Sequence, residues 1–147
     1  MTDAFLHRVN VRYMEVDAQG VVFNAWYLTY FDDAMTAFLE HRGLPYRTML
    51  DAGYDVQLVR SEIDYRAGVR WQDPVVVAVA TSRIGRTSFT LDFQVRRGCP
   101  DTGTDTDRAE VCTEGRTVYV VVATDGSGKR EIPTLIADAL GSPAPLF

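Results

Sequence analysis

The chain has 147 residues, of which 46% are apolar, and it carries a formal net charge of −5. This length suits one compact domain, and the apolar share argues against a disordered chain. The negative charge argues against binding to nucleic acid, and no apolar run approaches the ~20 residues that cross a bilayer. The first residues also lack the basic and apolar segments of a secretory signal. We therefore expect a cytoplasmic protein without a membrane span.

The sequence contains no recognisable cluster of metal ligands. Its two cysteines, Cys99 and Cys112, have no histidine or further cysteine at metal-ligand spacing, and in an unsecreted chain they are more often free thiols than a disulfide. His7 and His41 are far apart in the sequence, and we expect each at the surface or at a strand end. No metal site is therefore expected.

The first third of the chain predicts a strand, a turn and a long helix. Residues 5–13 alternate imperfectly with apolar side chains on one side, as in a strand, and residues 17–20 are typical of a tight turn. From Asn24 onward, apolar residues recur at three- and four-residue steps, which predicts an amphipathic helix of about four turns. Asn24 suits the N-cap of this helix, and Gly43 followed by Pro45 suits its end.

The rest of the chain is dominated by strand patterns. The order of a strand, a helix and four further strands predicts an α+β domain with a largely antiparallel sheet that is covered on one face. We expect a single domain over residues 1–140, followed by a loose tail at 141–147. The remaining predicted elements are a short helix at 46–52, strands at 55–66, 75–82, 88–96 and 110–123, a polar loop at 98–107 and a last short helix at 133–140.

Asp17 is the side chain whose position is most informative about chemistry. It follows a predicted strand and comes shortly before a predicted helix. On the residues alone, it is either a turn aspartate that binds nearby backbone N–H groups or a carboxylate beside a helix N-terminus. In the second case the unpaired N–H groups of the helix can bind a developing oxyanion while the carboxylate attacks a carbonyl or activates water. Acyl transfer requires both of these parts.

The residues around Asp17 resemble the signature of the 4-hydroxybenzoyl-CoA thioesterase family. The pattern is an aspartate, a glycine three residues later, two small apolar residues, and a tyrosine seven residues after that glycine. Shorter stretches at 71–73, 83–88 and 132–133 resemble the family's turn into its third strand, its next hairpin and its lead into the C-terminal helix. In this chain the main pattern consists of Asp17, Gly20, Val21, Val22 and Tyr27.

The resemblance implies a hotdog fold, in which a curled antiparallel sheet of about five strands wraps around one central helix. It also implies an acyl-CoA thioesterase, with CoA arriving as part of the substrate and no cofactor. Asp17 would be the catalytic carboxylate, acting as nucleophile or general base. The backbone N–H of Asn24 would polarise the carbonyl, and Gly20 would allow the turn that brings the two together.

Four further residues receive a substrate-binding role from the resemblance, each with a structural alternative. Tyr27 would pack near the acyl pocket, or it is a core aromatic of the helix. Asp32 would face a partner subunit's pocket, or it is a solvated helix residue. Arg83 and Arg86 would lie near the CoA phosphates, or they are solvated hairpin charges. The nucleotide can also be contacted by Arg60, Arg66 or Arg70, and the sequence does not choose among them.

The chain departs from one branch of the family, which carries a histidine where Asn24 stands. An asparagine can orient the thioester but cannot act as a base. Asp32 or Asp33 on the helix would replace Asp17 if it proved dispensable. The alternatives are a hotdog hydratase or dehydratase and an acyl-CoA binding protein without activity. We also expect a homodimer or homotetramer, because an exposed edge, which we assign to the last strand, invites pairing.

Overall fold

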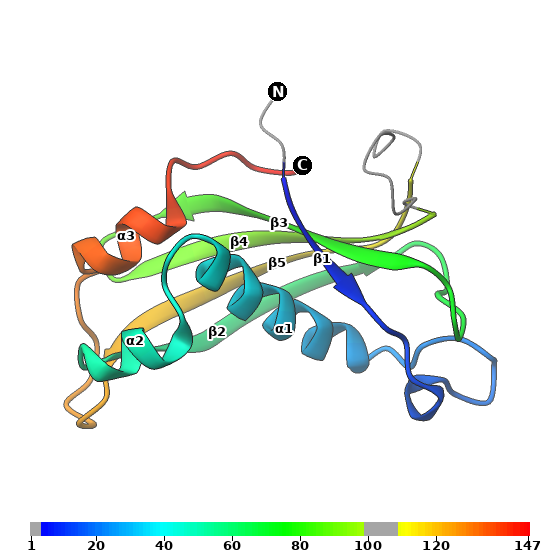
Figure 1. Cartoon of the computed structure of the whole chain (residues 1–147), viewed down its shortest axis with the longest axis horizontal. Coiled ribbons are helices and arrows are strands. Elements are labelled where there is room, and N and C mark those ends of the chain that lie inside the picture. Colours follow the sequence, from blue (N-terminus) through cyan, green and yellow to red (C-terminus); the bar gives the residue numbers. More distant parts are fainter. Residues whose placement is uncertain (1–3, 99–108) are drawn as a thin grey trace.

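A five-stranded antiparallel sheet curls around one long helix, as expected for a hotdog domain (Figure 1). The computed structural model describes residues 4–98 and 109–147, so Cys99 and most of the predicted polar loop lie outside the described residues. The strand order is β1-β3-β4-β5-β2. The elements are β1 (Phe5–Val9), a 3-10 turn (Tyr13–Glu15), α1 (Trp26–His41), α2 (Tyr46–Asp51), β2 (Tyr54–Tyr65), β3 (Val75–Ile84), β4 (Ser88–Arg97), β5 (Glu110–Ala123) and α3 (Thr134–Leu140).

The helix α1 packs on the concave face of the sheet through aromatic side chains. Phe31 stacks on Phe93 of β4 with ring centroids 4.6 Å apart. Gly115 of β5 gives this ring its space, since a Cβ atom there would lie 2.5 Å from the Phe31 ring. The predicted amphipathic stripe is thus the contact between helix and sheet. The buried residues of α1 are Tyr27, Tyr30, Phe31, Ala34, Phe38 and Leu39.

Two features of the first strand and the sheet edges differ from the prediction. The first strand ends at Val9 instead of residue 13, because the Glu15 carboxylate accepts the N–H of Arg12 and closes a turn there. The last strand, β5, is not an edge, since it lies between β4 and β2. The exposed edges of this sheet are therefore β1 and β2.

Asn24 is not the N-cap of α1, contrary to the prediction. The helix begins at Trp26, its N-cap is Ala25, and no side chain caps it. The Trp26 N–H donates to the carbonyl of Phe23 at 3.0 Å, so Asn24 and Ala25 form a turn ahead of the first helical residue. Asn24 lies two residues before the helix, ahead of the N-cap.

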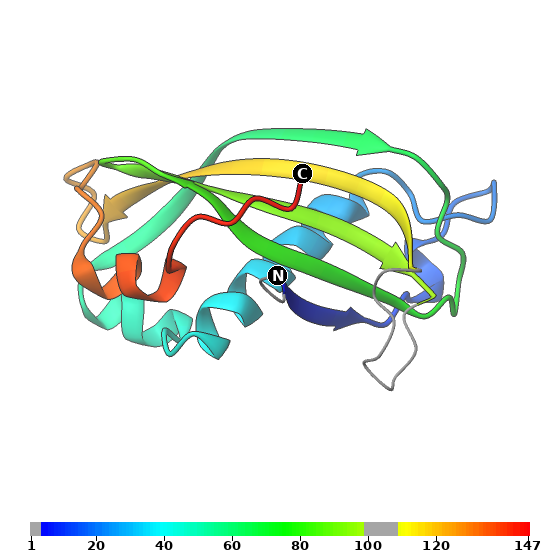
Figure 2. The same cartoon turned by 90° about the horizontal axis from the view of Figure 1, so that it is seen from above.

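The C-terminal tail is packed on the sheet. The sequence had predicted a loose tail, so this prediction was wrong. The Ala144 N–H donates to the Thr81 carbonyl at 2.7 Å, and the Leu146 N–H donates to Oδ2 of Asp92 at 2.9 Å. Asp92 is fully buried, and Arg116 binds its other oxygen at 2.7 Å. A buried carboxylate needs such partners, which explains why the tail crosses the outer face of the sheet (Figure 2). In the described part of the chain, no helix is long and apolar enough to span a membrane.

Candidate active site

Asp17 lies on a tight turn in the loop between β1 and α1. Its N–H donates to the carbonyl of Val21 at 2.9 Å, and its carbonyl accepts the N–H of Gly20 at 2.9 Å. Gly20 has a φ of +80°, a left-handed conformation in which glycine is unstrained. The Asp17 carboxylate accepts the N–H of Gln19 at 2.8 Å through Oδ1, as the turn interpretation predicted. Oδ2 makes no hydrogen bond among the described residues, so one oxygen is free to react.

The loop returns from Asp17 directly to the start of α1. Val16 and Val22 pair as an antiparallel bridge, and two residues later comes Asn24. In the part of the chain that the structure describes, the N–H of Asn24 donates no hydrogen bond. The first backbone N–H groups of a helix also lack partners and carry partial positive charge. The fold therefore places a carboxylate and the unbonded N–H of Asn24 in one short segment before α1, where the Trp26 N–H is itself taken by the Phe23 carbonyl.

Aromatic side chains line this segment. Tyr27, which is 3% exposed, packs edge-to-face against Tyr65 of β2 with ring centroids 5.6 Å apart. The Tyr65 hydroxyl donates to the carbonyl of Asn24 at 3.2 Å, so β2 holds the turn before the helix. Burial raises the pKa of Tyr27, which keeps its hydroxyl neutral. Tyr27 is thus a core residue of the helix, and its place near an acyl pocket stays a prediction.

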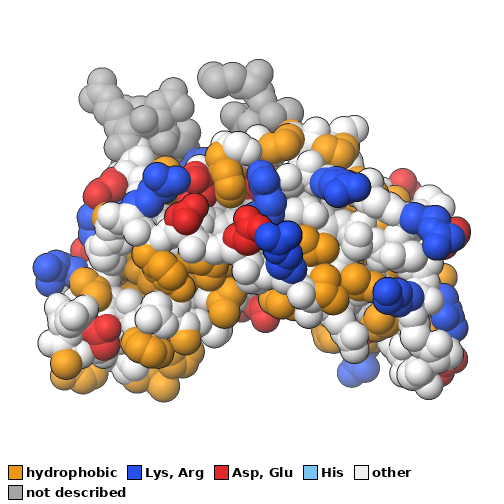
Figure 3. Space-filling view, turned by 180° about the vertical axis from the view of Figure 1, so that it is seen from behind, with side chains coloured by type: hydrophobic (Ala, Val, Ile, Leu, Met, Phe, Trp, Pro, Cys, Tyr) orange, Lys and Arg blue, Asp and Glu red, His pale blue; other side chains and the backbone are white. Residues whose placement is uncertain are grey.

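Exposed apolar side chains surround the same end of the molecule. Tyr13 is 74% exposed and stands edge-on to Trp71, which is 49% exposed. Met14 and Phe23 from the same loop are also exposed. Viewed from the back, where β2 lies, apolar side chains gather below a band of charged ones (Figure 3). This surface offers an apolar approach to the Asp17 loop.

The two helix aspartates face different surroundings. Desolvation raises the pKa of Asp32 from its ordinary value. The Asp33 carboxylate lies 3.5 Å from Nε2 of His7 on β1, and it is 75% exposed. His7 is therefore paired with an acid, which the sequence did not indicate.

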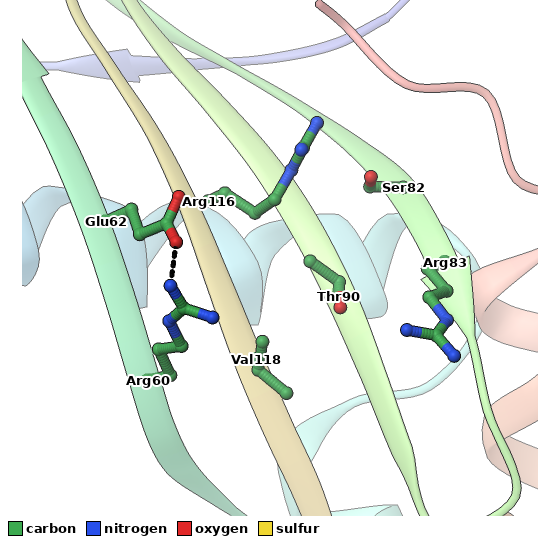
Figure 4. A pocket seen from close by; sticks show the side chains of 7 residues that line it. All are labelled: Arg60, Glu62, Ser82, Arg83, Thr90, Arg116 and Val118. Carbon is green, nitrogen blue, oxygen red and sulfur yellow. Dashed lines mark hydrogen bonds and ion pairs between the residues drawn. The ribbon is translucent and has the colours of Figure 1, made fainter.

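The structure separates the two arginines of the β3–β4 hairpin from Asp17. The hairpin and the Asp17 loop lie at opposite ends of the molecule in both views (Figures 1 and 2). Arg83 lines an open hollow on the outer face of the sheet, with α1 behind the strands (Figure 4). Arg86 instead pairs with Glu131 at 3.2 Å. The other residues around the hollow are Arg60, Glu62, Ser82, Thr90, Arg116 and Val118.

Comparisons with known proteins identify the family. A family model described as a thioesterase-like superfamily matches residues 11–140. The chain belongs to this superfamily. A relative in Aquifex aeolicus (strain VF5), whose name assigns it to the esterases, is 33% identical over 91 residues, which cover 62% of this chain and 71% of that protein.

Two further similarities agree with the predicted enzyme class and fold. The acyl-CoA thioesterase YbgC of Haemophilus influenzae is 26% identical over 98 residues, covering 66% of this chain and 72% of that protein. A crystal structure of a 4-hydroxybenzoyl-CoA thioesterase variant with 4-hydroxybenzoyl-CoA gives a TM-score of 0.77 at 19% identity, over 91% of this chain and 99% of that chain. At this identity the likeness shows the fold alone. The predicted family, hotdog fold and thioesterase class are confirmed.

Two residues beside the Asp17 loop of this thioesterase-like chain were not singled out from the sequence. Glu15 is 3% exposed and binds the Tyr30 hydroxyl, although a glutamate beside a turn reads as a surface residue. Tyr65 was expected only as a strand residue, since nothing local shows that β2 ends beside the helix start. Among the described residues, no group of histidine, cysteine and acidic side chains could hold a metal ion.

Proposed function

We propose that this chain hydrolyses acyl-CoA thioesters to a free carboxylic acid and CoA, with Asp17 as nucleophile or general base. The observation that carries the proposal is the free oxygen of Asp17 in the segment that leads into α1. The superfamily assignment supports the reaction class, and the geometry supports the choice of carboxylate. CoA enters as part of the substrate, and the proposed reaction uses no cofactor.

As a general base, the Asp17 carboxylate takes a proton from water as the water oxygen attacks the thioester carbonyl carbon. The electron pair of the carbonyl moves to its oxygen, where the N–H of Asn24, beside the N-terminus of α1, stabilises the negative charge. Collapse of this intermediate breaks the carbon–sulfur bond and releases CoA thiolate, which takes the proton that Asp17 removed from the water. Alternatively, Asp17 attacks the carbonyl carbon itself, the carbon–sulfur bond breaks as CoA thiolate leaves, and water hydrolyses the resulting anhydride to the free acid and the Asp17 carboxylate.

The β2 edge supports a homodimer or homotetramer. β2 has 12 residues, and one side of it has no strand partner. Leu58, Val59 and Tyr65 on this strand are each about half exposed. A long, unpaired edge that also exposes apolar side chains is a surface that proteins normally cover. We propose that a second copy pairs along β2, next to the Tyr65 and Asn24 contact.

Such pairing would give Arg83 and Arg86 a role that they cannot have within one chain. Because the β3–β4 hairpin lies at the far end from Asp17, these arginines would bind the CoA phosphates of a substrate held mainly by the partner subunit. Guanidinium groups suit phosphate because they offer paired donors in a plane. Asp32, on α1, would then lie at the acyl pocket between the subunits.

The test is thiol release from a panel of acyl-CoAs that includes benzoyl, phenylacetyl and straight-chain esters of several lengths. We expect turnover of at least one ester, and a loss of about a hundredfold or more in Asp17→Asn. Turnover that survives in Asp17→Asn would contradict the assignment and transfer it to Asp32 or Asp33. Binding of acyl-CoA without turnover would instead identify a binding protein, and addition of water across an acyl double bond would identify a hydratase.

A further inference from the structure

Glu15 is a buried carboxylate two residues before Asp17. It is 3% exposed and accepts four hydrogen bonds. Oε1 accepts the Arg12 N–H at 2.8 Å and the Tyr30 hydroxyl at 2.9 Å. Oε2 accepts Nε of Arg12 at 3.2 Å and Nη2 at 3.0 Å. All four contacts come from two residues, one on the loop and one on the helix.

Burying a charge is costly unless it is fully paired, so the position calls for a reason. A loop that only had to cover the core could use leucine or valine here. The carboxylate instead makes directional contacts to α1. Tyr30 lies one turn inside that helix, and the Arg12 guanidinium also sits over the ring of Trp26, its first residue, 5.6 Å from the centroid. Glu15 is therefore linked to the first two turns of α1 in two ways, directly through Tyr30 and indirectly through Arg12 and Trp26.

The backbone carries this contact on to Asp17. The carbonyl of Glu15 accepts the N–H of Phe23 at 2.9 Å, and the Asp17 N–H donates to Val21 at 2.9 Å. Backbone hydrogen bonds thus pair residues 15–17 with residues 21–23 across the loop. Any shift of Glu15 relative to Tyr30 would move Asp17 relative to the helix start.

We propose that Glu15, held by Tyr30 and Arg12, is a positioning residue that fixes the Asp17 carboxylate relative to the N-terminus of α1. The proposal rests on the role of Asp17 proposed above. Glu15 itself does not touch the substrate. It acts by restricting the segment 12–24, and a small misplacement of a reacting group lowers the rate steeply.

The decisive variant is Tyr30→Phe, which removes one hydroxyl and keeps the ring in the core. The matched control is Tyr46→Phe, because the Tyr46 hydroxyl also donates to a carboxylate, that of Asp55, between α2 and β2. Amide hydrogen exchange of residues 12–24 reports the position of the loop without any substrate. We expect exchange there to rise about tenfold or more in Tyr30→Phe, as fits the loss of a hydrogen bond to a charged group, and to stay unchanged in Tyr46→Phe.

Kinetics with an accepted acyl-CoA then link the loop to the reaction. We expect kcat to fall about tenfold in Tyr30→Phe with KM nearly unchanged, and no further fall when Tyr30→Phe is added to Asp17→Asn. Unchanged exchange in Tyr30→Phe overturns the proposal. So does an unchanged kcat in Tyr30→Phe when Asp17→Asn is inactive. Full activity of Asp17→Asn would overturn the proposed function, and the exchange result would still show whether Glu15 fixes the loop.

Discussion

Gly115→Ala tests how closely α1 packs against the sheet. The new Cβ would lie 2.5 Å and 2.9 Å from two carbons of the Phe31 ring and 3.1 Å from the carbonyl oxygen of Glu62. Phe31 is 1% exposed and stacked on Phe93, so its ring cannot simply swing away. Overpacking of this kind costs about 1–3 kcal/mol. We expect a loss toward the upper end of this range, because backbone as well as side-chain atoms are in the way.

Urea unfolding measures this loss. The midpoint should fall while the slope stays the same, since the compactness of the two states is unaffected. Phe31→Leu alone should also destabilise, by leaving a cavity, but in the double variant the shorter side chain makes room for the alanine. The double variant should therefore lose clearly less stability than the sum of the two single variants. Strict additivity, or an unchanged midpoint in Gly115→Ala, would refute the packing argument.

Three further predictions concern the tail, the helix and the Asp17 turn. Arg116→Leu leaves the Asp92 carboxylate buried without its cation and should cost up to about 3 kcal/mol in urea unfolding, most of which Asp92→Leu in the same chain should restore. Desolvation raises the pKa of Asp32, so the folded protein binds that proton more tightly than the unfolded chain, and stability is lost as pH rises from the ordinary value of 3.8 through the folded pKa. Asp32→Asn should thus be more stable than the natural chain at neutral pH, with the difference vanishing below that value. Gly20→Ala forces a side chain into a φ of +80° and should cost about 1 kcal/mol and reduce thiol release, whereas Gly20→Asn should lose less.

The fold followed from patterns that are local in the sequence. The three- and four-residue recurrence of apolar side chains located α1, and the alternation of Phe89, Leu91, Phe93 and Val95 located β4. The glycine and aspartate of the 17–20 segment located the turn. These features depend on neighbours within one turn or one strand, so a sequence is sufficient to find them.

The rest depends on contacts between distant residues. Nothing near Asp92 shows that its carboxylate is buried, because its partners are Arg116 and the backbone of Leu146. Glu15 is buried for a similar reason, since Tyr30 reaches it from the helix. The start of α1 was misplaced because the turn at Phe23 is fixed by Glu15 and not by the Asn24 side chain. Long-range polar pairing is therefore what the sequence left open.

The most direct test of the account compares two turn aspartates. Asp125 accepts the N–H of Ser127 at 2.8 Å just as Asp17 accepts that of Gln19 at 2.8 Å, but no helix begins beside Asp125. Thiol release from the best acyl-CoA would be measured for Asp17→Asn and Asp125→Asn. We expect a loss of about a hundredfold or more in the first variant and unchanged turnover in the second. Equal turnover in both variants would contradict a catalytic role for Asp17.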